Sequence, residues 1–220
     1  MNTRLLSLPS LALAASLSLA ACGGDDGGDG GSGDSGSGGD FTSLSGKEIA
    51  DEAKETMLEL DGVHLSGEAS SEGNGFALDI AVDAEGDCTG ELTAGGETIT
   101  VLGADGDVWF QAPQTQGKWI VDDGTFGDFC DLEKFLGNLF ADNDDDEYEV
   151  GEVEQVAGED AVPVTKKDDE GDSTGYVKVD GDHYLLKLSR EGADGGEFTF
   201  DSFDEDVETE APAEADIATE

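Results

Sequence analysis

The chain has 220 residues and a very uneven charge, with 54 acidic residues against 10 basic ones and a formal net charge of −44. Proteins that bind nucleic acids neutralise phosphates with a basic surface, so this composition excludes nucleic acid as a partner. A solvated surface suited to high salt is the simplest explanation of the acidity, and specific cation binding is the alternative.

The N-terminus has the layout of a secretory signal. Arg4 precedes an apolar run over residues 5–19, which is shorter than the roughly 20 residues that a membrane span requires. Leu-Ala-Ala-Cys at residues 19–22 resembles the lipobox of bacterial lipoproteins. That resemblance implies that residues 1–21 are a cleaved signal peptide and that acylated Cys22 anchors the protein to the extracytoplasmic face of the cell membrane. The alternative is a secreted protein cut near Ala21.

The remainder of the chain divides into three segments by composition. Residues 22–40 begin with the lipidated cysteine and are otherwise almost entirely Gly, Asp and Ser, which predicts a disordered tether. Residues 41–205 are long enough for one domain with a hydrophobic core. Residues 206–220 are predicted to form an acidic flexible tail. We expect the domain to be monomeric.

A helix is predicted at the start of the domain. Ser45 and Glu48 have the spacing of a capping box. Apolar residues then recur at helical intervals, at Ile49, Ala53, Met57 and Leu60. Gly62 is expected to end this helix in the left-handed conformation.

From residue 63 the apolar residues alternate with polar ones, which predicts an antiparallel meander. Tight turns at residues 95–96 and 105–106 and a three-residue loop at residues 84–86 give one consistent register. This register sets Leu92 opposite Ile99. The predicted apolar face carries Leu78, Ile80, Val82, Leu92, Ile99, Val101, Val108 and Phe110, with Val82 opposite Cys88 and Val101 opposite Phe110.

A second helix and a second meander follow. Asp131 is a candidate N-cap, and the apolar positions of this helix are Leu132, Phe135, Leu136, Leu139 and Phe140. Strands are expected near residues 149–156, 161–165, 175–179, 183–189 and 197–203. A turn at residues 180–182 puts Val177, Val179, Tyr184, Leu186 and Leu188 on one apolar face, and Lys178, His183 and Lys187 on the other.

Cys88 and Cys130 remain as an even pair once Cys22 is assigned to lipid. Cys88 belongs to the apolar face of the predicted sheet, and Cys130 immediately precedes the helix expected to cover it. Outside the cytoplasm a disulfide between them is favoured over two buried thiols.

Catalytic and metal-binding motifs are weak. Residues 171–175 match the Gly-x-Ser-x-Gly pattern around Ser173, and Asp182 and His183 follow it. That pattern requires the serine between a strand and a helix, whereas Ser173 leads into a predicted strand.

The chain has two histidines, and His64 falls on the polar side of its predicted strand, so a zinc site is not expected. Asp142 begins a run with calcium-loop spacing, but Glu147 and Val153 occupy the positions of the required Gly and Glu. We therefore expect no catalytic, cofactor or metal site and no enzyme activity.

Several segments together resemble the actinobacterial LppX/LprG-type lipoproteins over residues 41–212. Besides the lipobox and the tether, they are residues 45–50, 63–67, 87–90, 118–120 and 203–212. The resemblance implies a curved antiparallel half-barrel with helices on its concave face, similar to the lipoprotein carrier LolA. It also implies an apolar cavity for acyl chains and a role in moving or presenting lipids or lipoglycans. The extreme acidity departs from that pattern and favours a neutral cargo, or a cavity too small for cargo.

The sequence thus predicts an α+β fold and leaves two main functions open. One is a lipid or glycolipid carrier, whose cavity would be lined by the apolar faces of both meanders together with Phe135, Leu136, Leu139 and Phe140. The other is a cell-surface sensor or interaction module without cargo, because the same residues could form a filled core.

Overall fold

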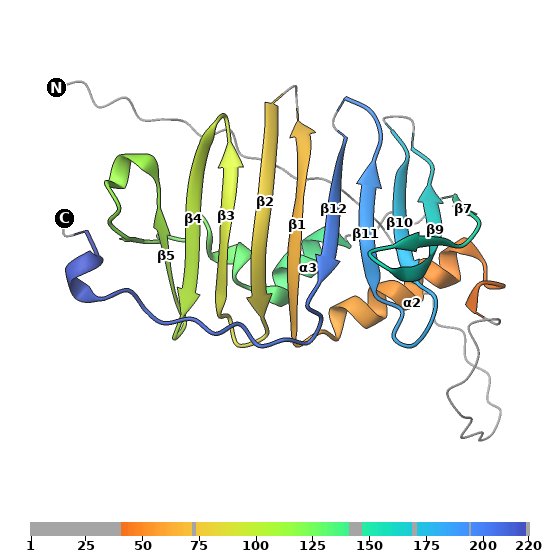
Figure 1. The fold of residues 1–220 in the computed structure, drawn as a ribbon, viewed down its shortest axis with the longest axis horizontal. Helices are drawn as coiled ribbons and strands as arrows, with labels where there is room; N and C mark the ends of the chain where they lie inside the picture. The colour runs from red at the N-terminus through yellow and green to blue at the C-terminus, as the bar shows by residue number, and fades with distance from the viewer. Residues whose placement is uncertain (1–40, 72–73, 141–146, 169–170, 194, 219–220) are drawn as a thin grey trace, which may run out of the picture.

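The computed structural model describes residues 41–71, 74–140, 147–168, 171–193 and 195–218. They form one twelve-stranded antiparallel sheet with two α-helices, so the predicted α+β half-barrel is confirmed. Both helices lie on the same side of the sheet (Figure 1), and we call that side the inner face. None of the helices in the described ranges is long and apolar enough to cross a membrane.

The sheet consists of two meanders that meet in its middle. The first comprises β1 (Gly62–Ser71), β2 (Asn74–Asp83), β3 (Cys88–Ala94), β4 (Glu97–Ala104), β5 (Asp107–Gln111) and β6 (Ile120–Val121). The second comprises β7 (Tyr148–Val150), β8 (Glu154–Val156), β9 (Glu159–Lys166), β10 (Ser173–Lys178), β11 (Leu185–Arg190) and β12 (Gly196–Asp201). The first strand pairs with the last, so the order is β6-β5-β4-β3-β2-β1-β12-β11-β10-β9-β7, with β8 beside β9 (Figure 1).

The predicted register of the first meander is confirmed. Leu92 pairs with Ile99, Val101 with Phe110, and Val82 with Cys88. The loop before Cys88 contains Gly86 in the left-handed region at φ 89°, as a hairpin loop of this length requires.

The second meander differs from the prediction at a β-bulge. Gly175 pairs with Leu188, but Val177 pairs with Leu185, so Leu186 is an extra residue in β11. Leu185 therefore takes the core position that was expected for Leu186, which is buried outside the main core cluster. The expected strand at 149–156 is also wrong in part, because β7 and β8 are separate strands.

The first helix is α2 (Gly46–Leu58), and its capping box is confirmed. The Ser45 side chain accepts a hydrogen bond from the backbone N–H of Glu48, whose carboxylate accepts one from the Ser45 N–H at 2.9 Å. The expectation for Gly62 is wrong, because Gly62 begins β1 and has no positive φ. Glycine is needed there because a Cβ would collide with the carbonyl oxygen of Glu205.

The second helix is α3 (Leu132–Leu139), which Asp131 caps by accepting a hydrogen bond from the Lys134 N–H at 3.0 Å. It follows the short helix η2 (Gly127–Phe129). The loop before η2 is held by Asp122, whose carboxylate accepts hydrogen bonds from four successive backbone N–H groups, those of residues 124–127. These hydrogen bonds leave no pattern of apolar residues in the sequence, so they were not predicted.

The C-terminal segment was expected to be a flexible tail, and the structure instead places residues 206–218 along the lower edge of the sheet (Figure 1). The Val207 N–H donates to the Asp83 carboxylate at 3.0 Å, and the Thr209 hydroxyl donates to the Gly103 carbonyl at 2.7 Å. Ile217 forms a parallel bridge with Trp119. Each of the two hydrogen bonds joins a backbone group to a side chain far away in the sequence, so the acidic composition gave no sign of them.

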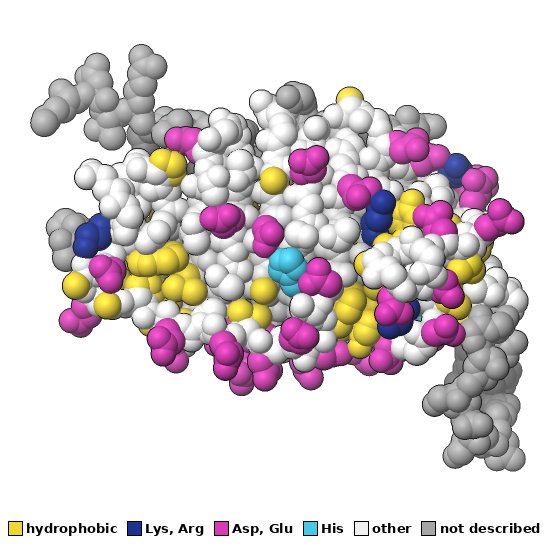
Figure 2. Space-filling model, viewed as in Figure 1, with side chains coloured by type: hydrophobic (Ala, Val, Ile, Leu, Met, Phe, Trp, Pro, Cys, Tyr) yellow, Lys and Arg dark blue, Asp and Glu magenta, His cyan; other side chains and the backbone are white. Residues whose placement is uncertain are grey.

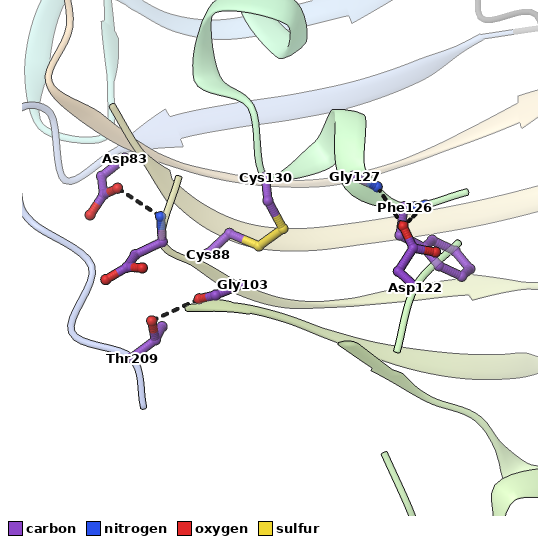
Figure 3. The surroundings of a disulfide bond; sticks show 9 residues. Asp83, Cys88, Gly103, Asp122, Phe126, Gly127, Cys130 and Thr209 are labelled. Atoms are coloured by element: carbon purple, nitrogen blue, oxygen red, sulfur yellow. Dashed lines mark hydrogen bonds between the residues drawn. A yellow bond between two sulfur atoms is a disulfide. The ribbon is translucent and has the colours of Figure 1, made fainter. Parts of the chain in front are cut away.

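Cys88 on β3 and Cys130 beside α3 are joined as a disulfide, with Cα atoms 5.2 Å apart (Figure 3). Both residues belong to the buried core cluster. Gly103 on β4 leaves room for the bridge, because a Cβ there would lie 3.0 Å from the Cys88 sulfur and 3.2 Å from the Cys130 sulfur. The disulfide therefore connects the segment that carries α3 to the inner face of the sheet.

Removal of the disulfide should strongly destabilise the domain. The cysteines are 42 residues apart in sequence, and closing such a loop in the unfolded chain is worth roughly 4 kcal/mol. We expect Cys88→Ala/Cys130→Ala to lower the free energy of unfolding by an amount of this order, measured by urea denaturation. Reduction of the unmodified chain should have the same effect. Quantitative alkylation of both cysteines in the native, unreduced protein would contradict the bridge.

Candidate functional site

The inner face of the sheet carries apolar side chains in rows that run across the strands. The lower row consists of Leu65, Ile80, Gly90, Val101 and Phe200, which are neighbours in the strand pairing. Ile80 and Val101 are 0% exposed, and Leu65 and Phe200 are 3% exposed. This row is a closed core, and a bulkier side chain in place of Val101 would overfill it.

The next row is less covered. This upper row consists of Leu188, Phe198, Gly67, Leu78, Leu92 and Ile99, again neighbours across six strands from β11 to β4. Leu78 and Leu188 are each 7% exposed, whereas Phe198, Leu92 and Ile99 are only half-buried. The upper row is therefore the less covered part of the inner face.

A third row lies at the ends of the strands, at the upper limit of the inner face, and its side chains are mostly polar or small. This rim row consists of Lys166, Ser173, Arg190, Gly196, Ala69, Phe76, Ala94 and Glu97. Its Phe76 ring contacts the upper-row Phe198 ring, with centroids 6.0 Å apart. Gly67 allows this contact, because a Cβ there would lie 2.6 Å from the Phe198 ring.

The other predicted lining residues separate into the same two classes. Val82, Leu136, Phe140, Val177 and Val179 are buried in the core cluster. Val108 and Phe135 are half-buried against it, and the half-buried Phe110 ring contacts Phe126 with centroids 5.1 Å apart. The side chain of Leu139 and residue Cys22 lie outside the described residues.

Tyr184 has a different role from the one predicted. Its ring stacks on Phe203 with centroids 4.2 Å apart, and its hydroxyl donates to the Asp204 carboxylate at 2.8 Å. Burial and the bond to Asp204 raise the pKa of Tyr184 to about 12. Tyr184 therefore fixes the start of the C-terminal segment.

Sequence reasoning missed several inner-face residues, among them Phe198 and Phe200 on β12 and Val162 and Val164 on β9. Phe198 and Phe200 flank polar Thr199, so their alternation was a signal, whereas Val162 and Val164 flank half-buried Pro163 and follow buried Ala161. Leu65 likewise belongs to the core through the alternation of β1.

The residues of the Gly-x-Ser-x-Gly match lie in settings that do not assemble a triad. Ser173 begins β10 between Lys166 and Arg190 of the neighbouring strands. His183 was expected on the polar face, but it precedes β11 and its ring stacks on buried Phe41, with centroids 3.6 Å apart. Within the described residues, no cluster of three or more His, Cys, Asp or Glu side chains could hold a metal ion.

The opposite, outer face is polar and carries many Asp and Glu side chains (Figure 2). His64 on β1 lies there between two carboxylates of the adjacent strands, with Nδ1 2.9 Å from Asp201 and Nε2 3.1 Å from Asp79. Burial lowers the pKa of His64, but its hydrogen bonds to Asp79 and Asp201 and their charges outweigh that effect. The pKa of His64 is therefore raised.

His64 should make stability depend on pH. A raised pKa in the folded state means that the stabilisation is fully present below the unfolded-state pKa of about 6.5, and is lost as pH rises through the folded-state pKa. We expect the Tm difference between the unmodified chain and His64→Gln to be larger at pH 6 than at pH 9. In an Asp79→Asn/Asp201→Asn background only the effect of burial on the pKa of His64 remains, so this dependence should disappear or reverse in sign. An equal difference at both pH values would contradict the role of the two carboxylates.

Comparisons with known proteins identify the fold. No protein-family model matches the sequence, and no curated protein matches it either. Among solved structures, the lipoprotein LppX of Mycobacterium tuberculosis matches with a TM-score of 0.52 at 14% identity, over 74% of this chain and 97% of that one. LprF of Mycobacterium bovis matches with a TM-score of 0.56 at 12% identity, over 76% of this chain and 97% of that one. The predicted resemblance is thus confirmed at the level of the fold, which this chain shares with LppX and LprF.

Proposed function

We propose that this protein is an extracytoplasmic lipoprotein that binds lipid acyl chains against the upper row of the inner face. The observation that carries this proposal is the change in burial between adjacent rows. The side chains of Leu65, Ile80, Val101 and Phe200 in the lower row are buried. In the upper row, Leu92, Ile99 and Phe198 remain half-buried although they are large and apolar. Ligand sites are typically concave and lined mostly by apolar side chains with a few polar groups, which is the composition of the upper row and its rim.

The fold supports the same conclusion. LppX, which shares it, is described as a lipoprotein. The signal-like N-terminus and the lipobox-like residues 19–22 of this chain agree with a lipid anchor at Cys22. Acyl chains on Cys22 would hold the domain near the membrane from which it takes its ligand.

Replacement of an upper-row side chain by an amide should weaken lipid binding. In the mature chain carrying Cys22→Ser, Ile99→Gln should raise the Kd for a fluorescent fatty acid roughly tenfold, since it buries an unpaired amide against the acyl chain. Thr98→Gln is the matched control, because Thr98 is exposed and bonds to Thr93, with the hydroxyl oxygens 2.9 Å apart. It should bind like the unmodified chain.

Thermal melts separate this site from a packed core. Ile99→Trp should be tolerated and should block binding, whereas Val101→Trp should destabilise the domain because Val101 is 0% exposed. If the unmodified chain binds no acyl lipid and both tryptophan substitutions unfold the domain, the inner face is a close-packed core. The protein would then be a cell-surface module without cargo.

The anchor is tested separately. Cys22→Ser in cells should release the protein from the membrane fraction while the melting temperature of the domain stays unchanged. Retention of the variant in salt-washed membranes would contradict lipidation at Cys22.

A further inference from the structure

Arg190 is an unusual cation in this chain because it has no acidic partner. Among the described residues, its side chain makes no ion pair or side-chain hydrogen bond. The chain carries 54 acidic residues, and most other described basic side chains are paired with them. These pairs are Lys47–Asp51, Lys134–Asp131, Lys167–Asp172, Lys178–Glu159 and Lys187–Glu197.

Arg190 also lies on the inner side of the sheet, at the rim. It is the last residue of β11 and follows Leu188 by two positions, so it shares the face of this core residue. Lys187, by contrast, bonds to Glu197 on the outer face. The arrowhead ends of β9 and β11 and the start of β10 lie at the upper rim, away from α2 (Figure 1).

The neighbours of Arg190 make this part of the rim polar. Ser173 pairs with Arg190 on one side and with Lys166 on the other. Ser173 is 9% exposed and Lys166 only 4% exposed, so a hydroxyl and an ammonium group are buried at this corner. Lys166 makes an interaction of its own within the protein, so Arg190 is the cation that is available for recognition.

We propose that Arg190 binds the anionic group, a carboxylate or phosphate, of a lipid whose acyl chain lies on the upper row. This inference rests on the function proposed above and adds the chemical class of the headgroup. The guanidinium is a fixed fork of donors that matches the oxygens of both anions, and its partial burial strengthens such a pair. Phe198 and Leu188 lie one row below Arg190, at the place where the chain of an amphiphile would begin.

The net charge of −44 does not oppose this site. At physiological salt the Debye length is about 8 Å, so most exposed carboxylates are screened from the rim. Glu197 on the adjacent strand β12 is paired with Lys187, and Asp172 near the start of β10 is paired with Lys167.

The test compares a fluorescent fatty acid with its methyl ester at pH 8, using the whole mature chain with Cys22→Ser. We expect this chain, with Arg190 intact, to bind the fatty acid more tightly than its methyl ester. Arg190→Gln should weaken binding of the acid roughly tenfold or more and leave the ester unchanged. Arg190→Lys should fall between the two because it keeps the charge and loses the fork. Lys187→Gln, which removes a cation of the same strand from the outer face, should leave both ligands unchanged.

The outcomes distinguish the headgroup site from the acyl site. Equal affinities for acid and ester would overturn the role of Arg190 and leave the acyl site intact. Equal losses of both ligands in Arg190→Gln would also overturn it, since the variant would then act through packing. If neither ligand binds, the acyl site fails and the headgroup assignment fails with it. A titration with inorganic phosphate in the absence of lipid distinguishes a lipid headgroup from a free anion. If the chain binds phosphate but no lipid, and Arg190→Gln abolishes phosphate binding, the site belongs to a free anion.

Discussion

The pairing of β1 with β12 is the constraint on which the architecture depends. Six residue pairs, from His64 with Asp201 to Ala69 with Gly196, join the first strand of the chain to its last. Without this seam each meander would end in an open edge and the two inner faces would not be continuous. On the outer face, His64 spans the seam by bonding to Asp201 of β12 and Asp79 of β2. A chain with a charge of −44 repels itself when compact. The raised pKa of His64 favours a positive charge between Asp79 and Asp201, and this charge counteracts the repulsion where the two meanders meet.

The graded burial of the inner face follows from the sizes of the elements. β1 and β2 have ten residues each, which corresponds to roughly 33 Å of strand. A helix that crosses the strands is about 10 Å wide, and α2 and α3 have 13 and 8 residues. They bury the lower row and leave the upper row partly uncovered. The disulfide and the C-terminal segment reinforce the same lower end, because Gly103 contacts the bridge and also accepts the hydrogen bond from Thr209. The sheet is therefore held firmly at its lower edge, and its inner face is apolar but less covered toward the rim.

The sequence predicted the features that depend on side-chain type. Alternation and turn glycines gave the pairing of Leu92 with Ile99, and Ser45 with Glu48 gave the start of α2. It did not predict features made by backbone groups. The bulge at Leu186 shifts the pairing by one residue without a glycine or proline to mark it, and the adjacent Leu185 and Leu186 are equally apolar, so their composition hides the shift. The docking of residues 206–218 depends on single hydrogen bonds between a backbone group and a distant side chain, such as that from the Val207 N–H to the Asp83 carboxylate, which an acidic composition does not reveal.

The net charge of the chain does not describe the charges near the candidate site, because the strands direct acidic side chains to the outer face of the sheet. Glu68, Asp79, Glu91 and Asp201 alternate with inner-face residues and are exposed on the outer side. In the rim row, the charged residues among those described are Lys166 and Arg190 at one end and Glu97 at the other. A ligand on the inner face would therefore meet Arg190 on β11 and an apolar surface from Phe198 to Ile99. The acidity of the chain determines what its outer surface repels, and the alternation of the strands determines what its inner face can hold.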